Sequence, residues 1–195
     1  MLTQTLFELA AQPEYIPALR KEALEAAEKC NWQLDKATLW DMVKLDNFIR
    51  ETHRLNSPNL MIRDTKLSNG MFLPKGTKLE FATHAIHHDE DFFENAEQFD
   101  GFRFLRMREK DKEAKHHYVT ARKDYLGWGV GKSACPGRFL ADIEIKLIVA
   151  YILLNYDLKN PPGQERHEHS EFENQVRLPE YYNAGTTEAD KAGGY

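Results

Sequence analysis

A single cysteine lies among glycines, directly before a strongly apolar helical pattern. The stretch from Tyr125 to Lys146 reads YLGWGVGKSACPGRFLADIEIK. A helix is predicted from about Pro136 to Tyr156, because proline is favoured in the first helical turn. Positive φ angles and close approach of the backbone to a ligand are possible at the nearby glycines, Gly129, Gly131 and Gly137. The pattern predicts a tight loop that presents Cys135 at the N-terminal end of a helix.

The chemistry of Cys135 has more than one interpretation. A thiolate is both a nucleophile and a metal ligand, and the positive end of a helix favours its formation. Cys135 could ligate a metal while a large flat ligand lies against the glycines. The alternatives are a nucleophilic thiol enzyme and a small buried side chain without chemistry. No histidine motif accompanies Cys135, and the glycine spacing suits a large ligand, which disfavours the thiol enzyme.

Composition excludes several classes of protein. The chain has 195 residues, enough for one domain with a substantial core, and a formal net charge of -5, which argues against a nucleic-acid-binding protein. Its two cysteines, Cys30 and Cys135, are too few and too far apart for a disulfide framework or a zinc ribbon, and indicate a reducing compartment. No stretch is long and apolar enough to predict a membrane segment.

The remaining pattern is mainly helical. Helices are predicted at 2–11, about 14–30, 36–55 and about 136–156, and antiparallel strands within 60–83. The last helix contains IKLIVAYILLNY, which is apolar on nearly every side and predicts a buried helix. The charged segment 106–123 is predicted to be a loop. The polar segment 161–195 is separated from a domain at 1–160, and its last residues are expected to be disordered.

The cysteine loop resembles the haem-binding loop of the cytochrome P450 superfamily. Its aromatic, glycine, cysteine and second glycine positions are held by Trp128, Gly131, Cys135 and Gly137. The position two before the cysteine is usually basic in the family, and here it is Ser133, which has no charge but can donate one hydrogen bond. The resemblance implies haem b (iron protoporphyrin IX), with Cys135 as the axial ligand of the iron. It implies further haem contacts at Trp128, Gly129, Gly131, Ser133 and Gly137.

Two upstream motifs carry the same resemblance. The family's Glu-x-x-Arg appears as Glu51 and Arg54, and Arg103 in FDGFRF matches the arginine that joins this pair. The resemblance implies a structural cluster of these three residues beneath the haem loop. Arg63, in the predicted strands, matches an arginine that reaches a haem propionate.

The resemblance implies the C-terminal portion of the cytochrome P450 fold, mainly α with a small antiparallel β-sheet. The implied function is a haem-thiolate monooxygenase, most like fungal microsomal members that oxidise terpenoid or indole-diterpene skeletons. It would use O2, a small hydrophobic substrate and electrons from NADPH-cytochrome P450 reductase. No catalytic residue is assigned, because the oxygen-activating threonine is expected upstream of Met1. The alternative is a non-catalytic haem-binding remnant or a gene-model fragment.

Location follows from the same resemblance. A full-length relative is expected at the endoplasmic reticulum membrane. This chain is expected to lack the anchor and to be cytoplasmic and soluble.

Overall fold

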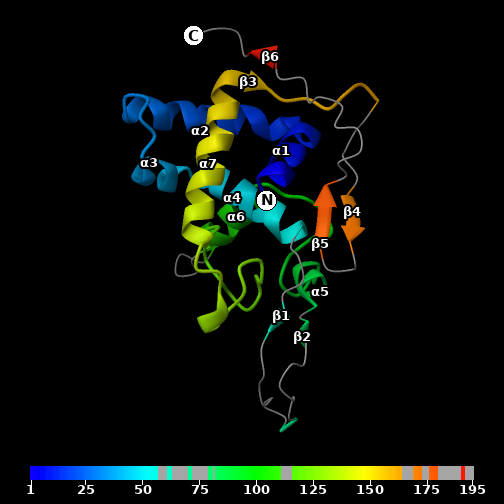
Figure 1. The fold of residues 1–195 in the computed structure, drawn as a ribbon. Coiled ribbons are helices and arrows are strands. Elements are labelled where there is room, and N and C mark those ends of the chain that lie inside the picture. Colours follow the sequence, from blue (N-terminus) through cyan, green and yellow to red (C-terminus); the bar gives the residue numbers. More distant parts are fainter. Residues whose placement is uncertain are drawn as a thin grey trace.

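The computed structural model describes residues 1–56, 61–62, 70–71, 79–80, 82–110, 116–163, 169–172, 176–179 and 190–191. Most of the described residues are helical (Figure 1). The helices are α1 (Leu2–Ala11), η1 (Pro13–Tyr15), α2 (Ile16–Lys29), α3 (Lys36–Asp41), α4 (Val43–Leu55), α5 (Thr83–His87), α6 (Arg103–Lys110), η2 (Gly131–Ser133) and α7 (Arg138–Asn155). The prediction of a mainly helical chain is confirmed.

The single helix predicted at 36–55 is wrong, because the chain bends at Met42. Met42 has φ −73° and ψ 78°, outside the helical region, and it separates α3 from α4. The carboxylate of Glu22, on α2, accepts hydrogen bonds from the backbone N–H groups of Lys44 and Leu45 at 2.8 and 2.9 Å. A side chain from a neighbouring helix therefore caps α4, and no local sequence signal announces that cap.

The core lies where α1, α2, α4 and α7 meet. Buried apolar side chains from all four helices form one cluster, including Leu9, Leu19, Phe48, Val149 and Leu153. In Figure 1, α7 (yellow) crosses α2 (blue). The guanidinium of Arg20, on α2, donates to the carbonyl oxygens of Leu153 and Tyr156 at 2.6 and 2.8 Å. These bonds satisfy carbonyl groups at the C-terminal end of α7 and fix it to α2.

Only one side of α7 is buried, so the prediction of a fully buried helix is wrong. Five large apolar side chains of α7 are exposed: Phe139, Leu140, Leu147, Ile148 and Tyr151. The apolar residues around the whole helix do not all find partners among the described residues. No described helix combines the length and the apolar character needed to cross a bilayer.

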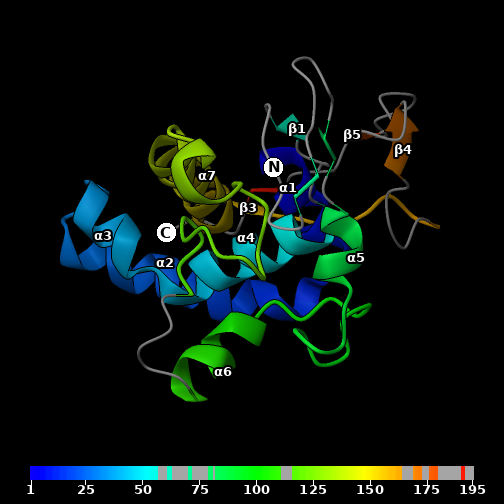
Figure 2. The same ribbon diagram turned by 90° about the horizontal axis from the view of Figure 1, so that it is seen from below.

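The predicted loop at 106–123 begins as a helix. Residues up to Lys110 belong to α6, whose first turns pack against α4, and residues 111–115 lie outside the described part of the chain. Figure 2 shows α4 between α7 and α6. Tertiary contacts to α4 stabilise a helix that the charge density of this segment disfavours.

The described strands form three separate antiparallel pairs. β1 (Met61–Ile62) pairs with β2 (Leu79–Glu80), β3 (Tyr156–Asp157) with β6 (Asp190–Lys191), and β4 (His169–Phe172) with β5 (Val176–Pro179). The first pair lies in the segment predicted to contain strands. The described residues do not join the pairs into one sheet, so the predicted small sheet is not confirmed. The domain boundary at 160 stays a prediction, and residues 192–195, expected to be disordered, lie outside the described residues.

Candidate functional site around Cys135

Two positive-φ glycines and one backbone hydrogen bond shape the loop at residues 125–137, which we call the Cys135 loop. The N–H of Cys135 donates to the carbonyl oxygen of Trp128 at 2.7 Å and closes the loop. Gly129 and Gly131 have φ angles of 74° and 60°, in the left-handed region that only glycine adopts without strain. Gly131 then starts the single turn of η2. The sequence folds into this loop because its glycines lie where the chain reverses.

Hydrogen bonds hold both peptide groups of Cys135. Beyond the bond to Trp128, the carbonyl oxygen of Cys135 accepts from the guanidinium of Arg138 at 2.7 Å. Arg138 also donates to the carbonyl oxygen of Val119 at 3.1 Å. The indole N–H of Trp128 donates to the carbonyl oxygen of Tyr118 at 2.7 Å. Trp128 and Arg138, which bond to the two peptide groups of Cys135, are therefore both anchored to the backbone at 118–119.

Open space borders the loop. Cys135 is half-buried and not in a disulfide. A methyl group placed on Gly131 or Gly137 would meet no other atom within 4 Å. Gly137 precedes the first turn of α7, and no side chain caps that turn. The glycines therefore leave room beside the cysteine for a ligand to lie close to the backbone.

The donor set at Cys135 suits a haem. The described residues contain no group of three or more His, Cys, Asp or Glu that could hold a metal ion. A metal ion bound by side chains alone requires several such ligands. A porphyrin supplies its own in-plane donors, so its iron requires only an axial ligand from the protein. One half-buried thiol beside open, glycine-lined space fits that requirement.

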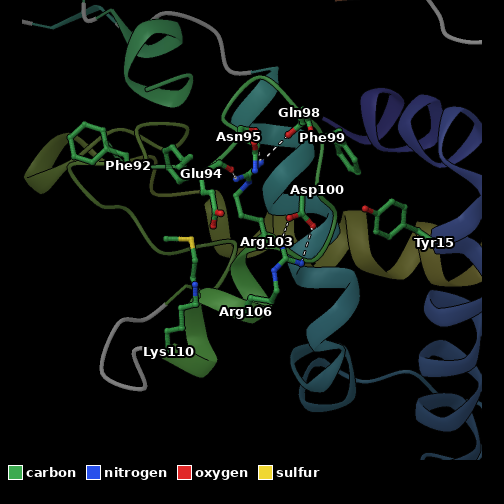
Figure 3. Close-up of a pocket in the computed structure, with 12 residues that line it drawn as sticks. Tyr15, Phe92, Glu94, Asn95, Gln98, Phe99, Asp100, Arg103, Arg106 and Lys110 are labelled. Carbon is green, nitrogen blue, oxygen red and sulfur yellow. Dashed lines mark hydrogen bonds and ion pairs between the residues drawn. The ribbon is translucent and has the colours of Figure 1, made fainter. Parts of the chain in front are cut away.

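Glu51, Arg54 and Arg103 form one buried cluster. The Glu51 carboxylate accepts two hydrogen bonds from Arg54, at 2.8 and 2.9 Å, and one from Arg103 at 3.0 Å. The side chains of Glu51 and Arg54 are 0% exposed. Arg103 also donates to the carbonyl oxygens of Asn95 and Gln98 at 3.1 and 2.9 Å (Figure 3). The cluster fixes the irregular segment before α6 to α4.

His87 connects this cluster to the Cys135 loop. Its Nδ1 lies 2.9 Å from the carbonyl oxygen of Arg54, and its Nε2 lies 2.8 Å from the backbone nitrogen of Leu126. The carbonyl can only accept and the N–H can only donate, so His87 is neutral with its proton on Nδ1. Burial is the main cause that lowers the pKa of His87 to about 4. The imidazole is therefore a fixed structural link at neutral pH.

Comparison with known proteins identifies the family. The family model described as Cytochrome P450 matches residues 1–183. Cytochrome P450 monooxygenase 151 of Postia placenta is 43% identical over 164 residues, which cover 80% of this chain and 33% of that protein. Cytochrome P450 monooxygenase BOA4 of Botryotinia fuckeliana is 42% identical over 173 residues, covering 85% of this chain and 35% of that protein. This chain belongs to the cytochrome P450 family.

Membership confirms the resemblance found in the sequence, including its fungal type. Cytochrome P450 monooxygenase hepE of Aspergillus oryzae is a further relative, 39% identical over 170 residues, or 84% of this chain and 30% of that protein. Cytochrome P450 proteins are haem enzymes that take electrons from a redox partner. The chain spans about a third of the length of the curated relatives it matches.

Two of the predicted haem contacts in this cytochrome P450 chain lack a described side chain. Arg63 lies outside the described residues. Ser133 has a described backbone, in η2, but its side chain is not described. The other predicted residues fall into two groups: Trp128, Gly129, Gly131 and Gly137 surround Cys135, and Glu51, Arg54 and Arg103 form the buried cluster.

A cavity of about 510 Å³ lies on another part of this cytochrome P450 chain, at the segment before α6 (Figure 3). Its lining includes Tyr15, Phe99 and Arg103, and an ion pair between Arg106 and Asp100 lies along it. No residue of the Cys135 loop lines it. This cavity is therefore separate from the candidate haem site.

Several residues that hold the site were missed in the sequence. His87 and Arg138 act through bonds to distant backbone groups, and Tyr118 packs its ring against Trp128 with ring centroids 5.0 Å apart. Burial raises the pKa of Tyr118, and nearby acidic groups, including Cys135, add to that effect. No sequence spacing could have signalled these contacts, because they join segments that only the fold brings together.

Proposed function

We propose that this chain carries the haem-ligating part of a monooxygenase that oxidises a small hydrophobic, terpenoid-like secondary metabolite. The cofactor would be haem b, and the electrons would come from NADPH-cytochrome P450 reductase. The observation that supports this most is Cys135: a half-buried thiol with both peptide groups bonded, beside open space, in a cytochrome P450 chain. The substrate class rests on the likeness of the sequence to fungal microsomal family members.

Each residue of the site has a proposed task. When bound, a thiolate-ligated haem supplies O2 activation, because electron density from the thiolate favours O–O cleavage. Cys135 provides the thiolate, and Trp128 and Arg138 hold its peptide groups so that the sulfur keeps one position. Gly131 and Gly137 leave room for the porphyrin beside the backbone. Arg63 and Ser133 are proposed to contact the haem propionates, through charge and through one hydrogen bond.

The buried cluster has a structural task in this proposal. The carboxylate of Glu51 pairs with both Arg54 and Arg103, and the three side chains are 0 to 6% exposed. Loss of one member of a buried charge cluster leaves its partners uncompensated, which is strongly destabilising. Glu51, Arg54 and Arg103 therefore hold the framework on which the Cys135 loop is built.

The chain offers a matched pair of cysteines for the test. Haem is added to the purified 195-residue chain, which is then reduced under carbon monoxide, and the absorption spectrum is recorded. We expect the red-shifted Soret band of thiolate-ligated haem, its loss in Cys135→Ser, and its retention in Cys30→Ser. Cys30 is the suitable control because its thiol bonds locally to the carbonyl oxygen of Ala26 at 3.2 Å, where a hydroxyl can replace it.

Activity is a separate question with its own measurement. With NADPH, the reductase and a set of terpenoids, an oxidised product would support the monooxygenase. Haem binding without product for this chain would support the haem site alone. A chain that takes up no haem, or a Cys135→Ser variant with an unchanged spectrum, would overturn the proposal.

A further inference from the structure

A buried carboxylate on α4 collects donors from three other segments. Asp46 is 2% exposed. Its Oδ1 accepts from the ammonium of Lys146, on α7, at 2.8 Å. Its Oδ2 accepts from the guanidinium of Arg108, on α6, at 2.5 Å and from the backbone N–H of Tyr118 at 3.0 Å. Asp46 thus joins α4, α6, α7 and the segment 116–120 at one point.

The segment 116–120 transmits this contact to the Cys135 loop. The N–H of Tyr118 bonds to Asp46, while the carbonyl oxygen of Tyr118 accepts from the indole of Trp128. The next carbonyl, that of Val119, accepts from Arg138. Trp128 and Arg138 are the residues that bond to the two peptide groups of Cys135. Two short hydrogen-bonded paths therefore lead from Asp46 to either side of the cysteine.

The charge of Asp46 is needed to keep this arrangement. Lys146 is 0% exposed, and its ammonium lies 2.8 Å from Asp46 and 2.9 Å from Asp142. Arg108 is also mostly buried and bonds to Asp46. An amide at position 46 would preserve the shape but place an NH2 group among donors, so one contact would be lost and two cations would lose a counter-charge.

We propose that Asp46 is a positioning residue for Cys135: its carboxylate fixes the segment 116–120, and the carbonyl groups of that segment hold Trp128 and Arg138 on either side of the cysteine. This inference rests on the proposed role of Cys135 as the haem ligand. Asp46 does not itself touch the ligand site. Its effect should therefore be on how Cys135 is held rather than on the presence of the thiol.

The test compares two carboxylates that share Lys146. Asp46→Asn removes the negative charge and one of the two oxygens that hold Lys146, Arg108 and the Tyr118 N–H. Asp142→Asn removes the other carboxylate next to Lys146, and within the described part of the chain Asp142 makes no hydrogen bond to the segment 116–120. Both variants are loaded with haem, reduced under carbon monoxide and scored for the fraction with the thiolate-ligated spectrum. We expect a several-fold lower thiolate-ligated fraction in Asp46→Asn and the parent value in Asp142→Asn. Equal fractions in the parent and in Asp46→Asn would overturn the proposal.

A second readout does not depend on haem. In a Cys30→Ser background, the haem-free chain is labelled with a thiol reagent, so only Cys135 reacts. Asp46→Asn should increase the labelling rate several-fold and Asp142→Asn should not; equal rates would count against the proposal. If the parent chain shows no thiolate-ligated haem, the proposed function fails, while the labelling rates still decide the role of Asp46.

A further variant covers the case in which Asp46→Asn does not fold. Trp128→Phe keeps an aromatic ring but removes the N–H that reaches Tyr118, together with part of the ring. It should lower the thiolate-ligated fraction and increase the labelling rate in the same direction. Parent values for both measurements in a folded Trp128→Phe chain would overturn the proposal.

Discussion

At the scale of single residues, two glycines near Cys135 have opposite surroundings. A Cβ added at Gly127 would lie 2.8 to 3.0 Å from three ring atoms of His53, which is fully buried and held edge-on against Trp128 with ring centroids 4.9 Å apart. A Cβ added at Gly137 would meet nothing within 4 Å. Packing within the chain therefore explains the first glycine but not the second.

Gly127→Ala is expected to destabilise the haem-free chain by about 1–3 kcal/mol, because a rigid imidazole cannot yield to the extra methyl group. The free energy of unfolding, measured in urea, checks this. Gly137→Ala is the control and should change that free energy by less than about 0.5 kcal/mol, as most unconstrained substitutions do. An equal loss of unfolding free energy in Gly127→Ala and Gly137→Ala would contradict the close packing of His53 against Gly127.

The residue scale also shows what spacing in a sequence can and cannot predict. The closeness of Glu51 and Arg54 follows from helical geometry, since residues three apart share a face. The positions of the glycines predicted the tight loop at Cys135. In contrast, Asp46 meets Lys146 across 100 residues, and His87 meets Leu126 across 39. Such contacts depend on how helices pack, which no local pattern encodes.

At the scale of elements, α4 is the support of the whole site. It carries Asp46, Glu51 and Arg54, and therefore contacts both the segment 116–120, which holds Trp128 and Arg138, and the segment before α6. Its N-terminus depends on Glu22 of α2 for two hydrogen bonds. The sequence predicted helix on both sides of Met42 but not the bend, because the cap that stabilises the bend comes from another helix.

Glu22→Ala should lower the free energy of unfolding by about 1–2 kcal/mol, since it leaves two helix N-terminal N–H groups without their acceptor. Chemical denaturation followed by circular dichroism measures this loss. Glu25→Ala is the matched change on the same helix. Among the residues that the structure describes, Glu25 makes one exposed pair, with Lys21 at 3.8 Å, so its removal should have little effect. A Glu22→Ala chain with the same unfolding free energy as the parent would show that the cap does not stabilise α4.

At the scale of the whole molecule, buried histidines make stability depend on pH. The pKa of His53 is lowered to about 3 and that of His87 to about 4, mainly because both side chains are buried. In the unfolded chain each would titrate near its ordinary value of about 6.5. Between about pH 6.5 and 4 the unfolded chain therefore binds protons that the folded chain does not. The stability present above pH 6.5 is progressively lost as the pH falls through that range.

His87→Gln tests this linkage, because glutamine can donate and accept but does not titrate. The plot of unfolding free energy against pH should become shallower by up to about 1.4 kcal/mol per pH unit between pH 6.5 and 4, the value for one proton. The parent chain, measured in the same way, is the reference. Urea denaturation at a series of pH values gives both slopes. A slope unaffected by His87→Gln would contradict the neutral tautomer assigned to that residue.

The uncovered side of α7 has a practical consequence for all of these measurements. Five large apolar side chains of this helix are exposed to water: Phe139, Leu140, Leu147, Ile148 and Tyr151. Exposed apolar side chains on one helix promote self-association. Solutions of the chain should therefore be kept dilute, and light scattering should be measured with each spectrum. Aggregation is then not mistaken for the loss of a ligand or of structure.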